Sequence, residues 1–281
     1  MTEATAKADA VPTPSSPASA SRFDGHDPYS LFGITQPAEG ETRMTPGPWL
    51  VDAAGQRHGG TLGMLTEVGW GMCAFRSRPD STFAGTTSSM AMEFLPGTDW
   101  VEQGDAVTVS ELLFADAAGS LVRGEVRSGT GQLVAFGSLN NRYVKLAEAW
   151  DPEFDAVGLG PDPSIGLNDI LELDPVQTAD GSSITFNSPE WLGNIFSGVQ
   201  GGVVMVLVEL AASTALDGGL AEWEPTSMRV DFHRPATVGE DLGIRSTKIQ
   251  AGRTMTLVEV VITKADGKRA VTGSVSYARK R

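Results

Sequence analysis

The sequence predicts an α+β fold in which one unit, a single helix beside an antiparallel sheet, occurs twice. Two apolar stretches begin with paired glycines, GGTLGMLTE at 59–67 and GGVVMVLVE at 201–209. Each is followed by four segments of strand-like composition, and a segment rich in Pro, Gly and Asp lies between the halves. We therefore expect two domains, 45–145 and 182–281, joined by a linker at 146–181.

The strand-like segments are separated by Gly, Asp and Pro at hairpin spacing, as in ADGK at 265–268. A sheet must cover its apolar face, and one long helix per half is available for this, which fits helices that are apolar nearly all round. The two sheets should pair edge to edge as a pseudo-dimer, with both helices on the concave side. The expected strands are 88–96, 106–115, 121–128, 132–144, 226–236, 241–249, 255–264 and 270–278.

Composition narrows the functional class. The formal net charge of −14 argues against a broad nucleic-acid-binding surface. A single cysteine, Cys73, fits a core position in a reducing compartment, so we expect a cytoplasmic protein. No apolar run is long enough to predict a membrane span. Residues 1–44 begin with an Ala-, Ser-, Thr- and Pro-rich stretch and are expected to form a disordered tail.

A set of polar residues recurs around the paired glycines. In each half a polar residue stands six positions before a His or Gln, and a carboxylate stands nine positions after it. Such matched spacing indicates a duplicated site rather than two unrelated helices. The first set is Asp52, His58, Gly59, Gly60 and Glu67, and the second is Asn194, Gln200, Gly201, Gly202 and Glu209.

These motifs resemble the hotdog-fold acyl-CoA thioesterases, in the branch that contains phenylacetyl-CoA and 4-hydroxybenzoyl-CoA enzymes. The stretch MRVDFHRPATVGEDL at 228–242 is also typical of that family. The resemblance covers about 46–144 and 182–281, so it implies a double hotdog and hydrolysis of an acyl-CoA or acyl-carrier thioester. The sequence departs from the family pattern at Asp52, where Asn or Gln is usual, and at Gln200, where His is usual.

The glycines are candidates for binding the thioester carbonyl. Amides in the first turn of a helix have no intrahelical partner, and glycine lets a ligand approach the backbone. The amide of Gly59 or Gly201 is therefore a candidate donor to the oxyanion that forms during hydrolysis. The alternative is that the glycines only permit close helix packing.

The carboxylates Glu67 and Glu209 are candidate bases. An acid in an apolar helix is costly unless it is paired or faces a cleft, and burial raises its pKa toward that of a general base. Either acid could activate water or attack the thioester directly, and a buried structural acid is the alternative. Gly59 and Glu67 are about 12 Å apart along one helix, so each base should serve the glycine of the other half.

Two composite sites follow, and the sequence favours the first. It joins Gly59 and His58 to Glu209, which Ser213 would orient from one turn further along the helix. Asp52 would support the loop. The second site joins Gly201 and Gln200 to Glu67, where Gly71 takes the place of Ser213. The residues expected to contact substrate are Asp52, Gly60, Asn194, Gln200 and Gly202.

No cofactor is expected. The three histidines lack the spacing of a zinc site. A non-catalytic hotdog protein that binds acyl or aromatic CoA ligands stays an alternative. A hotdog hydratase or dehydratase fits less well. Those enzymes look like they need an Asp and a His a few residues apart on one loop-helix segment, and this pair is not found in the sequence. The double unit could assemble further into a homo-oligomer.

Overall fold

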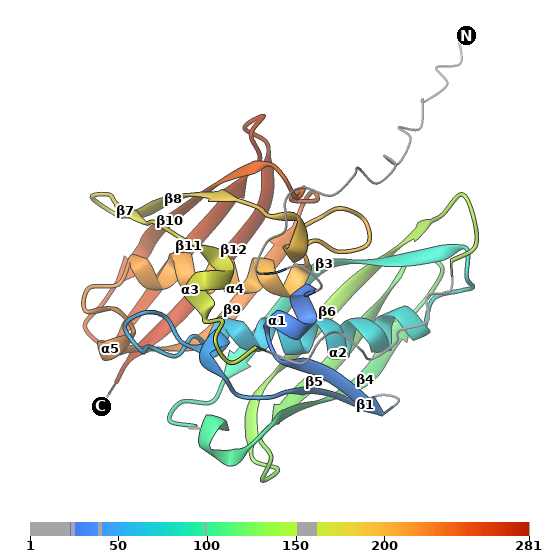
Figure 1. Ribbon diagram of the computed structural model, residues 1–281, viewed down its shortest axis with the longest axis horizontal. Coiled ribbons are helices and arrows are strands. Elements are labelled where there is room, and N and C mark those ends of the chain that lie inside the picture. The colour runs from blue at the N-terminus through green and yellow to red at the C-terminus, as the bar shows by residue number, and fades with distance from the viewer. Residues whose placement is uncertain (1–22, 24–25, 39–40, 99, 151–161, 281) are drawn as a thin grey trace.

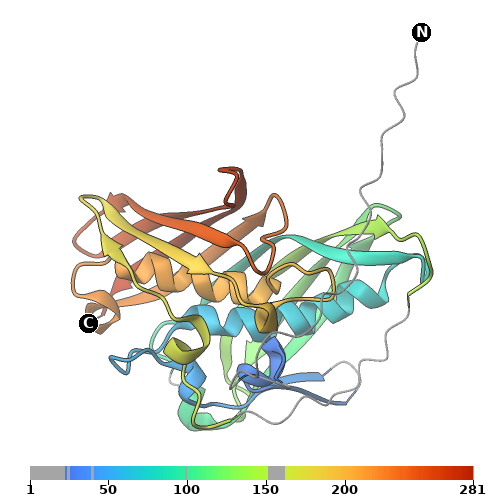
Figure 2. The ribbon, with the colours of Figure 1, turned by 45° about the horizontal axis from the view of Figure 1, so that its top comes forward.

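The fold is a 12-stranded antiparallel sheet with two long helices on one side of it, α2 (Leu62–Arg76) and α4 (Gly201–Thr214). Figures 1 and 2 show both helices lying across the same face of the sheet. The computed structural model describes residues 23, 26–38, 41–98, 100–150 and 162–280. Within these residues, no helix has the length and apolar character needed to cross a membrane.

Each long helix is followed by four sheet strands, as the sequence predicts. The strand order across the sheet is β1-β2-β4-β5-β6-β3-β9-β12-β11-β10-β8-β7, so each half forms one contiguous block. Expected and observed strand ends differ by a few residues. The strands that follow the helices are β3 (Phe83–Phe94), β4 (Ala106–Ala115), β5 (Gly119–Arg127), β6 (Leu133–Lys145), β9 (Trp223–Phe232), β10 (Asp241–Ala251), β11 (Met255–Thr263) and β12 (Arg269–Arg279).

The two halves join through β3 and β9. These antiparallel strands pair from Ser89 opposite Asp231 to Glu93 opposite Ser227, so the two expected sheets form one continuous sheet. This pairing covers only part of β3, which extends from Phe83 to Phe94. The first residues of β3 therefore pair with β6 on one side, and no strand in the described part of the chain pairs with them on the other.

The helices α2 and α4 pack against each other in antiparallel directions. A Cβ atom added to Gly63 would lie 2.5 Å from Cβ of Met205, and one added to Gly202 would lie 2.6 Å from Cα of Met64. As the residue number increases along α2, the number of the contacting residue in α4 decreases, so the two helices are antiparallel. These glycines let the two backbones approach closely, and this approach brings each helix start beside the middle of the other helix.

The loop before each helix has the same backbone pattern. In the first half, Val51 bridges to Arg57 and the amide of His58 donates to Leu50. In the second half, Gly193 bridges to Val199 and the amide of Gln200 donates to Leu192. The duplication therefore includes the loops. A short 3₁₀ helix precedes each one, η1 (Pro48–Leu50) and η4 (Glu190–Leu192), and a third, η2 (Gly59–Thr61), leads into α2.

The expectation of a disordered tail to residue 44 is wrong for its second part. The chain forms α1 (Pro28–Leu31), β1 (Ile34–Ala38) and β2 (Glu41–Met44), and β2 pairs with β4. Leu31, Phe32 and Met44 are buried in the core, so their apolar side chains hold this segment against the first half. Residues 1–22 lie outside the described residues.

The expected linker also contains regular structure. Of 146–181, residues 151–161 lie outside the described residues, and the rest includes α3 (Leu167–Leu171) and β7 (Val176–Gln177). Strand β7 pairs with β8 (Gly181–Asn187) at the far edge of the sheet. Two short helices complete the fold, η3 (Trp100–Gln103) and α5 (Gly219–Glu222).

The contact between the helices predicts that Gly63→Ala is destabilising. The added methyl group would overlap Met205, and overpacking of this kind costs about 1–3 kcal/mol of unfolding free energy. Gly71→Ala in the same helix is the matched control, because nothing lies within 4 Å of its added Cβ. Urea unfolding of both variants measures the difference. Equal stability of the two variants would contradict the packing argument.

Candidate functional site

The antiparallel helices create two polar clusters, and each combines residues of both halves. One cluster places Glu67 of α2 beside Gln200 and Gly201 at the start of α4. The other places Glu209 of α4 beside His58 and Gly60, ahead of α2. The structure thus brings Glu67 beside Gly201 and Glu209 beside His58 as expected, but the glycine packed against Glu209 is Gly60, while Gly59 faces Pro225 and Phe94. The two clusters differ in their hydrogen bonds and in their access to a cavity.

In the first cluster, Gln200 connects the start of α4 to Glu67. Its side-chain oxygen accepts hydrogen bonds from the amides of Gly202, at 2.6 Å, and Val203, at 3.1 Å. Its side-chain nitrogen donates to Oε2 of Glu67. The other carboxylate oxygen of Glu67 accepts a 3.4 Å hydrogen bond from the hydroxyl of Thr87 on β3. Gln200 therefore caps α4 and at the same time positions the carboxylate of Glu67.

Gly201 lies directly against this acid. A Cβ atom on Gly201 would lie 3.0 Å from Oε1 of Glu67, so the absence of a side chain lets the backbone meet the carboxylate. Gln200 accepts from the next two amides, and within the described part of the chain no acceptor bonds the amide of Gly201. A free first-turn amide next to an acid is suited to bind a carbonyl oxygen.

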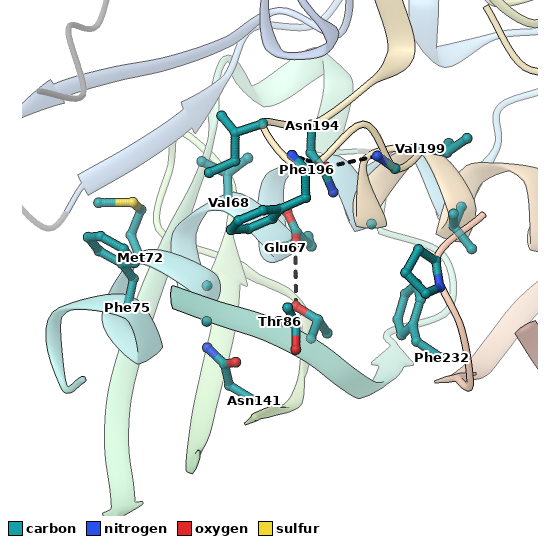
Figure 3. A pocket seen from close by; sticks show the side chains of 18 of the residues that line it. Glu67, Val68, Met72, Phe75, Thr86, Asn141, Asn194, Phe196, Val199 and Phe232 are labelled. Atoms are coloured by element: carbon teal, nitrogen blue, oxygen red, sulfur yellow. Dashed lines mark hydrogen bonds between the residues drawn. The ribbon is translucent and has the colours of Figure 1, made fainter. Parts of the chain in front are cut away.

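A cavity of about 830 Å³ opens onto Glu67, Gly201 and Asn194. Figure 3 shows Glu67 between the strand that carries Thr86 and the loop that carries Asn194 and Phe196. The cavity is mainly apolar near the helices, and the α1–β1 segment contributes Tyr29 and Ile34 to its wall. Apolar side chains that line it include Val68, Met72, Phe75, Trp150, Phe196, Val204 and Phe232.

The surroundings of Glu67 change its acidity. Burial raises the pKa of Glu67 from 4.5 to about 7, although the hydrogen bonds from Gln200 and Thr87 oppose the rise. Burial also raises the pKa of the nearby Tyr29, and the negative charges of Glu67 and Asp27 add to this effect. Tyr29 therefore stays protonated, while Glu67 can exchange a proton near neutral pH.

In the second cluster, His58 bridges two carboxylates. Its Nδ1 lies 2.7 Å from Oε2 of Glu209, and its Nε2 lies 3.1 Å from Oδ2 of Asp52. The hydroxyl of Tyr277 on β12 donates to Oε1 of Glu209 at 3.2 Å. A Cβ atom on Gly60 would lie 2.5 Å from Cβ of Glu209, so this acid is packed against the backbone.

This second cluster is closed. The side chain of Glu209 has no exposed surface, and that of His58 is 2% exposed. The described residues that line the cavity do not include Gly59, His58 or Glu209. Gly59 faces Pro225 and Phe94, which would contact a Cβ atom at this position. The imidazole and the acid of the cluster that the sequence favours are therefore buried and lie apart from the cavity, and the other cluster meets it.

Charge pairing controls the acidity of this closed cluster. Burial alone would lower the pKa of His58, but the negative charges of Glu209 and Asp52 and their hydrogen bonds outweigh it, and the pKa is raised. Burial acts to raise the pKa of Asp52, yet hydrogen bonds from the Gln56 amide and from His58 lower it overall. Burial and Glu209 raise the pKa of Tyr277. An imidazolium held between acids is the expected state.

Ser213 does not orient Glu209 as the sequence predicts. Its hydroxyl donates to the backbone carbonyl of Leu210 at 2.8 Å, because a serine inside a helix can bond the preceding turn. The hydroxyl that contacts Glu209 belongs to Tyr277, which the sequence analysis missed. Tyr277 is buried on the same face of β12 as Gly273 and Val275, so only its core position could be inferred from the sequence.

Asp52 and Asn194 have the same role in the two loops. Asp52 accepts from the amides of Ala54 and Gln56, and Asn194 accepts from the amides of Phe196 and Gly198. Both side chains thus stabilise the turn before the helix. Asp52 reaches His58 with its second oxygen, whereas Asn194 also lines the cavity.

Other candidate groups lie apart from the clusters. Cys73 packs against the core and His233 is exposed on the segment after β9. Within the residues that the structure describes, no group of three or more His, Cys, Asp and Glu side chains is arranged to hold a metal ion.

Comparisons with known proteins identify related folds. Residues 188–278 match a family model described as the acyl-CoA thioesterase N-terminal domain. None of the curated proteins matches the sequence. The tesB protein of Mycobacterium avium subspecies paratuberculosis has a similar structure, with a TM-score of 0.65 and 14% identity over 89% of this chain and 97% of that chain.

Two further solved structures have similar folds. An acyl-CoA thioesterase II from Mycobacterium marinum has a TM-score of 0.61 and 14% identity over 89% of this chain and 96% of that chain. A 12:0-ACP thioesterase from Umbellularia californica has a TM-score of 0.57 and 11% identity over 86% and 95%. The resemblance to hotdog-fold thioesterases is confirmed by the family match and the shared fold, and the family match supports thioester hydrolase activity.

The closed cluster predicts a pH-dependent effect of His58→Gln on stability. Because the folded-state pKa of His58 is raised, its stabilisation is fully present below its ordinary pKa of 6.5 and is lost as the pH rises through the folded-state value. Removing one partner of a buried ion pair costs about 3–5 kcal/mol, so we expect a loss of this order at pH 6 and a smaller loss at pH 9.

Urea unfolding at both pH values measures this effect, with His233→Gln as the exposed control. The control should change stability little at either pH. A loss from His58→Gln that is the same at pH 6 and pH 9 would show that folding does not raise the pKa of His58.

Proposed function

We propose that the chain is a double-hotdog thioesterase, with units at 45–145 and 182–281, that hydrolyses an acyl thioester at the Glu67 cluster. One observation favours this cluster over the Glu209 cluster: the cavity that reaches Glu67 and Gly201 does not include Glu209 or Gly59 among its lining residues. A substrate must reach both the base and the oxyanion donor. In the Glu209 cluster, both oxygens of Glu209 and both ring nitrogens of His58 are already bonded to other side chains, so it is better suited to hold the two halves together.

The proposed reaction uses residues of both halves. The thioester carbonyl oxygen accepts a hydrogen bond from the Gly201 amide, at the positive end of the α4 dipole. Glu67, as a carboxylate, takes a proton from a water molecule, and the water oxygen forms a bond to the carbonyl carbon. The tetrahedral intermediate then collapses, the carbon–sulfur bond breaks, and the proton held by Glu67 passes to the leaving thiolate. Direct attack by Glu67 on the carbonyl carbon is the other route open to the same geometry.

Gln200 and Thr87 are proposed as positioning residues. Both donate to Glu67 and so fix the direction in which its carboxylate faces. Because Gln200 also accepts from the amides of Gly202 and Val203, it sets the acid relative to the helix start. Asn194 shapes the adjacent loop and contributes to the cavity wall.

The apolar cavity is proposed to hold the acyl group. Its aromatic wall includes Trp150, whose ring lies 5.5 Å from that of Phe75 and 6.1 Å from that of Phe196 in edge-on arrangements. The matched family model is named for acyl-CoA substrates, whereas one similar structure is an acyl-carrier-protein thioesterase. We propose an acyl-CoA as the substrate.

The proposed base predicts that Glu67→Gln abolishes most turnover. Loss of a general base typically slows a reaction by about 100-fold to 10,000-fold, and the amide keeps the size of the side chain. Thiol release from a panel of acyl-CoA thioesters measures kcat and KM. Glu209→Gln is the matched comparison, and we expect it to lower stability while the folded protein keeps most of its kcat.

The reverse result, with activity lost in Glu209→Gln and kept in Glu67→Gln, would move the reaction to the other cluster. Binding of acyl-CoA without thiol release from any thioester of the panel would favour a ligand-binding protein instead.

The pKa of Glu67 predicts the pH dependence of the rate. A carboxyl with a pKa of about 7 is mostly protonated at pH 6 and ionised at pH 8, so kcat/KM should rise through pH 7 and then level off. Since the hydrogen bond from Gln200 lowers this pKa, Gln200→Ala should move the inflection to higher pH. Rates measured from pH 5 to pH 9 test both points. A flat profile, or an inflection that Gln200→Ala leaves unchanged, would exclude Glu67 as the titrating base.

A further inference from the structure

Residues near the seam between the halves, on both faces of the sheet, line the cavity. Along β6, Asn141 and Tyr143 are buried, and the hydroxyl of Tyr143 bonds to Ala74 on α2, so these residues face the helices. Arg142 and Val144 alternate with them, are exposed, and must face the opposite side of the sheet. Because the cavity is lined by Asn141 as well as by Arg142 and Val144, it reaches both faces.

The short β3–β9 pairing explains how the cavity can cross the sheet. The two strands are bonded only from Ser89 to Glu93 of β3, so the part of β3 before Ser89 has an open edge. Residues of this part, including Thr86, line one side of the cavity. Phe232 and the residues after β9 line the other side, and Figure 3 shows Phe232 to one side of the strand that carries Thr86.

Two exposed arginines, one from each half, line this cavity. Arg142 lies opposite Thr86 in the β3–β6 ladder, and Arg234 follows the end of β9. Both are exposed and both line the cavity. Nη1 of Arg234 donates to the carbonyl of Arg269 at 3.0 Å, which positions the guanidinium and leaves further N–H donors.

These two arginines are not neutralised by the acids around them. Among the described residues, neither forms an ion pair with a carboxylate, and Asp231 at the end of β9 is already paired with Arg229 at 2.8 Å. Exposed arginines without acid partners, at the mouth of a cavity in a chain with a net charge of −14, indicate a local site for an anion. Guanidinium groups bind phosphate through paired hydrogen bonds.

We propose that Arg142 and Arg234 bind the phosphate groups at the far end of the substrate's pantetheine arm. The thioester would lie at Glu67 on the helix side, the arm would cross the sheet beside the open edge of β3, and the phosphates would meet the two arginines outside. This inference takes its ligand class from the proposed function. It makes Arg142 and Arg234 specificity-determining residues that act on binding and not on the chemical step.

The test compares thioesters that share one acyl group and differ in their phosphates. Arg142→Gln and Arg234→Gln should each raise KM for the acyl-CoA roughly tenfold, since a hydrogen bond to a charged group is lost, and should leave kcat unchanged. Neither variant should change KM for the corresponding acyl-pantetheine, which has no phosphate. Arg253→Gln removes an equal charge from the exposed turn between β10 and β11 and is the matched control.

The 4′-phosphopantetheine thioester locates the contact. If the arginine variants raise KM for this compound as well as for acyl-CoA, the contact lies at the phosphate that CoA shares with carrier proteins. If they raise KM for acyl-CoA alone, the contact lies at the phosphates of the nucleotide. Either result supports the proposal. An equal effect on acyl-pantetheine, or no effect of either variant on acyl-CoA, would overturn it.

Calorimetric binding of CoA keeps this test independent of catalysis. The Kd of CoA should rise roughly tenfold in each variant and stay unchanged in Arg253→Gln. If the unaltered protein binds CoA through these arginines but releases no thiol from acyl-CoA, the proposed hydrolysis fails and the phosphate site stands. If CoA binds Arg142→Gln and Arg234→Gln as tightly as the unaltered protein, the phosphate site fails.

Discussion

The close antiparallel contact between α2 and α4 is the constraint on which both polar clusters depend. Gly63 and Gly202 allow the backbones to approach, and Met64 and Met205 fill the positions opposite them. With the helices at this distance, the acid in the middle of one helix must lie beside the start of the other. A wider separation would leave Glu67 away from Gln200 and Glu209 away from His58, and each buried carboxylate would then lose a hydrogen-bond partner, which is costly.

Much of the fold could be predicted because the duplicated pattern is physically simple. Apolar helices after paired glycines and alternating strands between turn residues gave element positions close to those observed. The edge-to-edge pairing followed from the need to cover one sheet face with one helix per half. The α1–β2 segment was missed because its few apolar residues, such as Phe32 and Met44, follow a long polar stretch and bury themselves only against β4 and the first half.

The candidate site was predictable in its pairing but not in its openness. Spacing along the helices placed Glu67 with Gly201 and Glu209 with Gly59, but no local pattern states which pair meets a cavity. That property depends on side chains far apart in sequence, such as Pro225 and Phe94 beside Gly59. The choice of Ser213 failed for a related reason, because a helical serine can bond its own backbone, while Tyr277 reaches Glu209 from a distant strand.

The covalent joining of two similar units has a consequence for how the clusters can differ. When two identical chains assemble symmetrically, any substitution appears at both equivalent positions, so the two must keep one common chemistry. Here His58 and Gln200 occupy equivalent loop positions and have different partners. A fused gene can alter one copy alone. One copy of a position can therefore come to form a hydrogen bond between the two halves, while the other copy stays available to contact a ligand.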